Sequence, residues 1–136
     1  MRCYGLAFAW LLACVATLGS LYFSLGLGLT PCTLCWYQRI CLYPLVITLG
    51  FAAWRADRTA ALYLLPQIFF GFFISLYQVI IQQVPKWDPI GFCGSGPSCS
   101  DKHEIGLGFV TIPMLSAIGF LAIAWMIIRA YRKNRV

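Results

Sequence analysis

The segment TPCTLCWYQRICLYP, residues 30–44, holds a Cys-x-x-Cys pair, Cys32 and Cys35, followed by Arg39. Two thiols at this spacing are typical of redox enzymes, in which one thiol attacks a disulfide and the other resolves the intermediate. In a helix that begins near Cys32, both thiols and Arg39 lie on one face, because Arg39 follows Cys35 by four residues. The helix dipole and the guanidinium both favour a thiolate there. The spacing therefore predicts a reactive dithiol beside a fixed positive charge.

Each part of this motif also has a plainer interpretation. Arg39 could be an interfacial anchor that extends to lipid headgroups, and the thiol pair could be a static staple. A staple that closes so short a loop adds little stability, and a charge inside an apolar span is by default a functional hypothesis. Cys41 is about 240° around the helix from Cys35 at 100° per residue, so we expect it to point elsewhere.

A second cysteine pair, Cys93 and Cys99, lies in the segment GFCGSGPSCSDKHE. Gly94, Gly96 and Pro97 allow the chain to turn back, so that the two thiols can approach within disulfide distance. A structural disulfide is the alternative here as well. Two redox pairs in one chain predict a relay, in which a thiolate of one pair attacks the disulfide of the other through a mixed disulfide.

The relay needs an electron acceptor, and the sequence encodes no common one. It contains neither the Cys-x-x-Cys-His string of haem attachment nor a Gly-x-Gly-x-x-Gly nucleotide fingerprint. A lipid-soluble quinone between helices beside Cys35 and Arg39 is the acceptor that we expect.

The composition predicts that these cysteines belong to a membrane protein. Of the 136 residues, 61% are hydrophobic and 10% are charged, whereas soluble domains are about 45–50% apolar. The apolar runs do not alternate with polar residues, and four strands are too few to close a membrane barrel. We predict one all-α domain over residues 1–136, a four-transmembrane-helix bundle. Its spans approach the ~20 residues that cross a bilayer and cover residues 4–29, 36–54, 60–81 and 108–128.

The basic residues are divided unequally between the two sides of such a bundle. One side carries Arg2, Arg55, Arg58, Arg129, Arg132, Lys133 and Arg135, and the other carries Arg39, Lys86 and Lys102. The positive-inside rule therefore predicts that both termini are cytoplasmic. The long loop between the third and fourth spans is then the second extracytoplasmic loop. Both close cysteine pairs then lie on the oxidising side, where disulfides persist. The net charge of +6 indicates topology, and nucleic-acid binding is not expected.

The string Cys32-Thr-Leu-Cys35-Trp-Tyr-Gln-Arg39, the four-helix hydropathy and the later cysteine-bearing loop resemble the DsbB/BdbC family of membrane thiol–disulfide oxidoreductases. The segment VTIPMLS before the last span is similar to the short, BdbC-like members, and the resemblance covers essentially the whole chain. It implies an enzyme of the bacterial cell membrane that uses ubiquinone or menaquinone. Its partner would be an extracytoplasmic DsbA/BdbD-like protein of thioredoxin fold, which it reoxidises.

The resemblance also implies a role for each site residue. Cys93 and Cys99 would exchange with the partner and pass electrons to Cys32 and Cys35. Cys35 would contact the quinone ring as a thiolate, and Arg39 would hold a ring oxygen and stabilise negative charge.

Further residues could line a quinone pocket, although each is more often an interfacial aromatic or a packing residue: Tyr22, Phe23, Trp36, Tyr37, Tyr77 and Gln78. The chain departs from some relatives in lacking a histidine after the third span, and its sole histidine, His103, receives no role. Cys3, Cys14 and Cys41 are expected to pack as small hydrophobic residues.

Three other functions remain open from the sequence. Four cysteines could bind zinc, although five residues between Cys93 and Cys99 exceed the usual ligand spacing. The chain could instead be a membrane scaffold with two structural disulfides. An enzyme like vitamin K epoxide reductase shares the chemistry, but it usually places its Cys-x-x-Cys after the loop pair.

Overall fold

The computed structural model describes residues 4–26, 28, 33–84 and 112–135, and all secondary structure in this part of the chain is helical. Its elements are α1 (Tyr4–Leu21), the π-helix η1 (Tyr22–Gly26), α2 (Thr33–Trp54), α3 (Arg58–Leu62), α4 (Leu65–Gln83) and α5 (Ile112–Arg135). Four stretches are long and apolar enough to cross a membrane: Tyr4–Gly26, Thr33–Trp54, Arg58–Gln83 and Ile112–Lys133. The prediction of an all-α protein with four membrane-spanning helices is confirmed.

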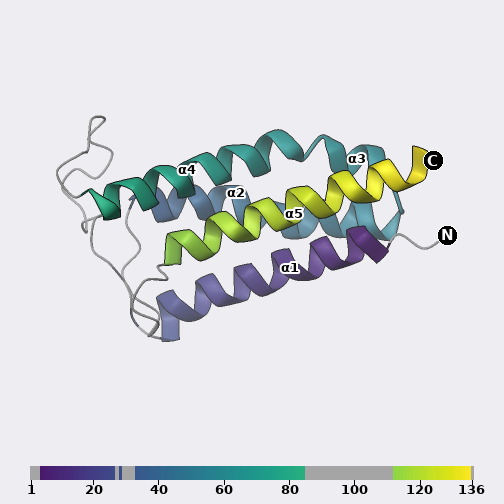
Figure 1. The fold of residues 1–136 in the computed structure, drawn as a ribbon. Helices are drawn as coiled ribbons and strands as arrows, with labels where there is room; N and C mark the ends of the chain where they lie inside the picture. The colour runs from purple at the N-terminus through teal and green to yellow at the C-terminus, as the bar shows by residue number, and fades with distance from the viewer. Residues whose placement is uncertain (1–3, 27, 29–32, 85–111, 136) are drawn as a thin grey trace.

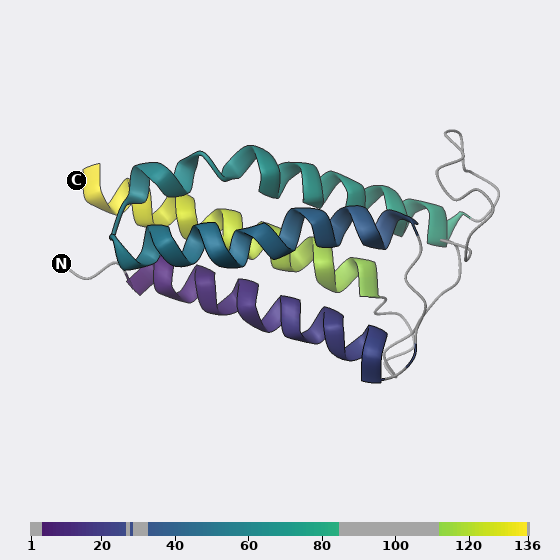
Figure 2. The same cartoon turned by 180° about the vertical axis from the view of Figure 1, so that it is seen from behind.

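The long helices form a ring in which each packs against two others. Both α1 and α4 pack against α2 and α5, and neighbouring helices run in opposite directions (Figures 1 and 2). The start of α1 and the end of α5 lie at one end of the bundle, together with the short α3 (Figure 1). The side of the membrane that this end faces stays a prediction from the charges.

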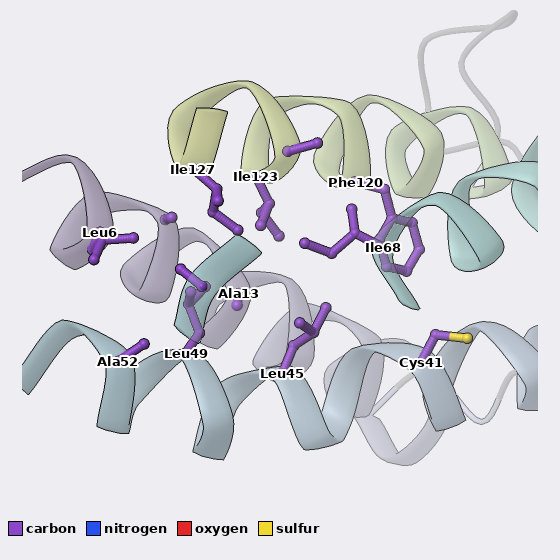
Figure 3. Close-up of a cluster of buried hydrophobic side chains, with 13 residues drawn as sticks. Leu6, Ala13, Cys41, Leu45, Leu49, Ala52, Ile68, Phe120, Ile123 and Ile127 are labelled. Atoms are coloured by element: carbon purple, nitrogen blue, oxygen red, sulfur yellow. The ribbon is translucent and has the colours of Figure 1, made fainter. Parts of the chain in front are cut away.

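Buried apolar side chains from all four long helices meet in one cluster between the helices (Figure 3). On α2 the buried residues recur every three or four positions, as a helical face requires: Leu34, Gln38, Cys41, Leu45, Leu49 and Ala52. Cys41 belongs to the apolar core, as its expected packing role requires. Large apolar side chains such as Leu18 and Ile47 remain exposed on the outer surface, which is what a lipid-facing surface needs.

Small residues let the helices approach closely, as is common in membrane bundles. A Cβ atom added to Gly71 of α4 would lie 2.7 Å from Cζ of Phe120 on α5, so the phenyl ring packs directly on the glycine. Gly50 of α2 accommodates Trp10 of α1 in the same way. The indole Nε1 of Trp10 also donates a hydrogen bond of 2.9 Å to the carbonyl of Val46.

Two prolines shape the helices in different ways. Pro66 lies in the first turn of α4, and the helix before it ends at Leu62 because proline lacks an N–H and clashes with the preceding turn. The predicted third span is therefore two helices in sequence. Pro44 lies inside α2. Because proline has no N–H, a backbone carbonyl in the preceding turn loses its usual donor and needs another partner. The Nε2 of Gln67 on α4 donates to the carbonyl of Cys41 in that turn at 2.7 Å.

Candidate active site

Cys35 lies in the first turn of α2, which begins at Thr33. The observed start lies before the predicted span of 36–54 and places the thiol at the positive end of the helix dipole, as expected. The side chain is half-buried and turns toward α4, where Nε2 of Gln78 lies 3.4 Å from its Sγ. The thiol thus meets a buried amide of the neighbouring helix.

That amide is itself held by a second glutamine. Nε2 of Gln38, one turn after Cys35 on α2, donates to Oε1 of Gln78 at 2.6 Å. Both side chains are buried, with exposed fractions of 8% for Gln38 and 2% for Gln78. Because burying an amide without partners costs free energy, this hydrogen bond is what allows two glutamines to lie here.

Arg39 turns toward α1, away from the glutamine pair. Its Nε donates to Oγ of Ser20 at 3.1 Å, and its Nη2 donates to the carbonyl of Ser20 at 3.2 Å and to Oγ of Ser24. The Cζ atom also lies 5.4 Å from the centroid of the Trp36 ring, within cation–π range. The guanidinium is therefore fixed in place by α1, η1 and its own helix.

The π-helix η1 carries one of the two serines that hold Arg39. Ser24 lies in η1, and Ser20 lies in the last turn of α1 just before it. Single π-helical turns inside α-helices are rare and often occur at functional sites. The predicted first span, 4–29, thus changes from α-helix to π-helix at Tyr22, close to where Ser24 contacts Arg39 of α2.

An apolar groove of about 380 Å³ lies between α2 and α4. Its lining includes Leu34, the residue before Cys35, and Tyr77, the residue before Gln78; the full lining is Leu34, Tyr37, Phe70, Phe73, Ile74 and Tyr77. The groove therefore gives an apolar, aromatic surface next to the thiol–amide contact.

The chemistry of these groups fits a quinone, which combines a flat apolar ring with carbonyl acceptors. The bonds to Ser20 and Ser24 use Nε and Nη2 of Arg39. Among the residues that the structure describes, Nη1 has no hydrogen-bond partner and remains a charged donor. Aromatic side chains and the groove supply the apolar surface.

The residues predicted for the site are thus brought partly together. Cys35 and Arg39 are one helical turn apart on α2, but Cys35 contacts α4 and Arg39 contacts α1. Of the predicted pocket residues, Tyr37 and Tyr77 line the groove, and Gln78 contacts Cys35. Trp36 contacts Arg39. Tyr22 and Phe23 lie in η1 and meet edge to face.

Other predicted residues cannot be placed in this way. Cys32, Cys93, Cys99 and His103 lie outside the described residues, and so does Cys3. In the part of the chain that the structure covers, no three potential metal ligands come together.

Sequence reasoning missed Ser20, Ser24 and Gln38. The four-residue spacing of the two serines was a usable signal, because it places both hydroxyls on one helix face. Gln38 was visible as a polar residue three positions after Cys35, a spacing that also shares a face. Neither spacing predicts which neighbouring helix these side chains contact.

Fold and site together define a class: a small four-helix membrane protein with a cysteine at a helix start and an anchored arginine one turn deeper. Residues 3–130 match the family model "Disulfide bond formation protein DsbB". The chain belongs to the DsbB family, and it is a membrane protein-disulfide oxidoreductase of the disulfide-generating kind.

Curated relatives agree with this assignment. A "Probable disulfide formation protein" of Coxiella burnetii (strain RSA 493 / Nine Mile phase I) is 47% identical over 132 residues, which cover 96% of this chain and 90% of the relative. One of Chlamydia trachomatis is 48% identical over 134 residues, covering 98% and 97%. The "Probable disulfide formation protein C 2" of Bacillus anthracis is 45% identical over 123 residues, covering 90% and 87%. No solved structure matches the chain significantly.

Proposed function

We propose that this enzyme reoxidises an extracytoplasmic dithiol oxidase of thioredoxin fold and delivers the electrons to a membrane quinone. The observation that carries the proposal is Arg39. A guanidinium is anchored by three hydrogen bonds inside a membrane bundle, one turn from Cys35, and none of these bonds to described residues uses Nη1. Burying a charge in this position costs free energy. Binding an acceptor oxygen beside a reactive thiol is a function that explains why Arg39 lies here.

The proposed order of thiol exchange follows from the two cysteine pairs. The partner's dithiol reduces the Cys93–Cys99 disulfide and becomes a disulfide itself. The loop dithiol then reduces Cys32–Cys35 and is reoxidised. Each exchange breaks one S–S bond and forms one, so two electrons and two protons move inward at each step.

The residues that would hold the quinone are Arg39, through Nη1, and the neighbouring Cys35. A bound quinone supplies the two-electron, two-proton acceptor that thiol chemistry alone lacks. Arg39 stabilises negative charge on an acceptor oxygen, because a fixed guanidinium in a low-dielectric site needs no reorganisation. Cys35 presents its sulfur from the first turn of α2.

The first prediction concerns the four cysteines of the relay. Serine at Cys32, Cys35, Cys93 or Cys99 is expected to abolish turnover, because a pair with one thiol cannot carry two electrons. The measurement is quinone-dependent oxidation of a reduced thioredoxin-fold oxidase by the purified chain in detergent. Cys14→Ser is the matched control, since Cys14 lies within α1, and it should retain activity.

Normal turnover in any one of the four serine variants would refute the relay. The rival functions give different results. A metal-binding protein would contain one stoichiometric zinc after purification. A structural scaffold would form no mixed disulfide with a thioredoxin-fold protein, whereas a relay lacking one loop cysteine should trap one.

A further inference from the structure

The buried glutamine pair between α2 and α4 places the amide of Gln78 against the thiol of Cys35, with the N–H end nearer the sulfur. Gln78 has an exposed fraction of 2% and Gln38 of 8%. Side chains this deeply buried have little access to water or lipid, so the orientation of each amide is decided by its protein neighbours. The hydrogen bond within the glutamine pair therefore bears on which amide atom lies nearest the sulfur.

The hydrogen bond between the glutamines fixes that orientation. Oε1 of Gln78 accepts from Nε2 of Gln38 at 2.6 Å. Nε2 of Gln78 then donates to Sγ of Cys35 at 3.4 Å, whereas the thiol donates to Oε1 of the same amide at the longer distance of 3.9 Å. The donor end of the amide is thus the nearer group. The reverse orientation would bring the amide oxygen toward the thiol and leave two N–H groups facing each other, unless Gln38 also turned.

The orientation matters because the two ends of an amide favour different states of sulfur. An N–H donor stabilises a thiolate, whereas an oxygen acceptor stabilises the protonated thiol. Only the thiolate is a nucleophile. Donation from Gln38 also polarises the Gln78 amide, which strengthens its N–H as a donor.

We propose that Gln78 is a positioning residue that keeps Cys35 reactive by donating to its sulfur, and that Gln38 acts through Gln78 by orienting the amide. This deepens the proposed function and rests on the redox role of Cys35 given there. The relay thus depends on an interhelical contact between α2 and α4 as well as on the motif within α2.

The test measures the rate at which iodoacetamide alkylates Cys35 at pH 7. The fully reduced chain in detergent is used without quinone or partner, and the modified peptide is quantified by mass spectrometry. The variants are Gln78→Met, Gln38→Met and the double variant, because methionine keeps the length of the side chain but has no N–H donor. Cys14, in α1, provides an internal reference rate in each sample.

We expect Gln78→Met to slow alkylation of Cys35 roughly fivefold, since losing a hydrogen bond to the thiolate lowers the thiolate fraction, and the higher nucleophilicity of the remaining thiolate offsets part of that loss. Gln38→Met should slow it about twofold, because the Gln78 amide loses its orienting partner. In the Gln78→Met background, Gln38→Met should have no further effect. Gln67→Met is the matched control and should leave the rate unchanged, because Gln67 contacts the carbonyl of Cys41.

An unchanged rate at Cys35 in Gln78→Met overturns the proposal, and so does an additive effect of Gln38→Met in the double variant. The double variant keeps the test valid if a single variant folds poorly, because removing both glutamines leaves neither member of the pair buried without the other. Since no quinone or partner takes part, the result is independent of whether quinone-dependent turnover is found.

Discussion

Polar side chains of α2 contact two different neighbouring helices: Cys35 and Gln38 contact α4, whereas Arg39 contacts α1. Three hydrogen bonds to Ser20 and Ser24 hold its guanidinium on the α1 side. We expect Arg39→Ala to raise the quinone KM about tenfold or more, because a hydrogen bond to a charged group contributes roughly 1.5–3 kcal/mol. The paired change Ser20→Ala with Ser24→Ala should raise it severalfold, since Arg39 remains but is less well positioned. Steady-state oxidation of the reduced partner at varied quinone concentration measures both.

The matched control for the serine pair is Thr17→Val. Its hydroxyl donates to the carbonyl of Ala13 within α1 at 2.9 Å, so the quinone KM should not change. Quinone kinetics that are the same in Arg39→Ala as in the unmodified chain would contradict the role of the guanidinium.

Whole helices are positioned by close contacts between small and large residues, and the contact of α4 with α5 is the clearest case. Phe120 is 2% exposed, and Cζ of its ring lies only 2.7 Å from the position that a Cβ of Gly71 would take. We expect Gly71→Ala to destabilise the bundle by about 1–3 kcal/mol, because overpacking forces the helices apart or the ring out of its rotamer. Thermal unfolding in detergent, followed by circular dichroism, measures the change.

Gly119→Ala is the matched control on α5, next to Phe120 in sequence. A Cβ at Gly119 would meet nothing within 4 Å, so the variant should be as stable as the unmodified chain or slightly more stable, since alanine is the better helix former. Equal stability of the two variants would show that the packing of Phe120 on Gly71 does not limit the α4–α5 contact.

In the molecule as a whole, the start of α1 and the end of α5 lie at one end of the bundle (Figure 1). Basic residues gather there, including Arg58 at the start of α3 and Arg129, whose Cζ lies 4.9 Å from the Trp125 ring. The positive-inside rule predicts that this end is cytoplasmic. Alkaline phosphatase needs disulfides and should therefore be inactive when fused after Val136. Fused after Val84, at the other end of α4, it should be active. Activity in the first fusion and none in the second would reverse the topology.

The sequence by itself was sufficient for the features that depend on local composition. Hydropathy predicted four spans, because crossing lipid requires about 20 apolar residues in a row, and the structure contains four such stretches. Spacing within one helix placed Cys35 and Arg39 a turn apart, since helix geometry is the same everywhere. The break of the third span before Pro66 also follows from a local rule, because proline disrupts the preceding helical turn. The predicted span of 60–81 nevertheless treated this segment as one helix.

The contacts between helices were decided only by the tertiary structure. Nothing in the sequence states that Cys35 meets Gln78 of α4, or that Arg39 meets Ser20 and Ser24 near the end of α1. The physical reason is that lipid is as apolar as the helix surfaces, so burial does not select which face turns inward. Close packing of small residues and a few interhelical hydrogen bonds make that choice, and they depend on residues far apart in the chain. The sequence therefore predicts which groups carry the chemistry, and the packing of the bundle determined which neighbours contact Cys35 and Arg39.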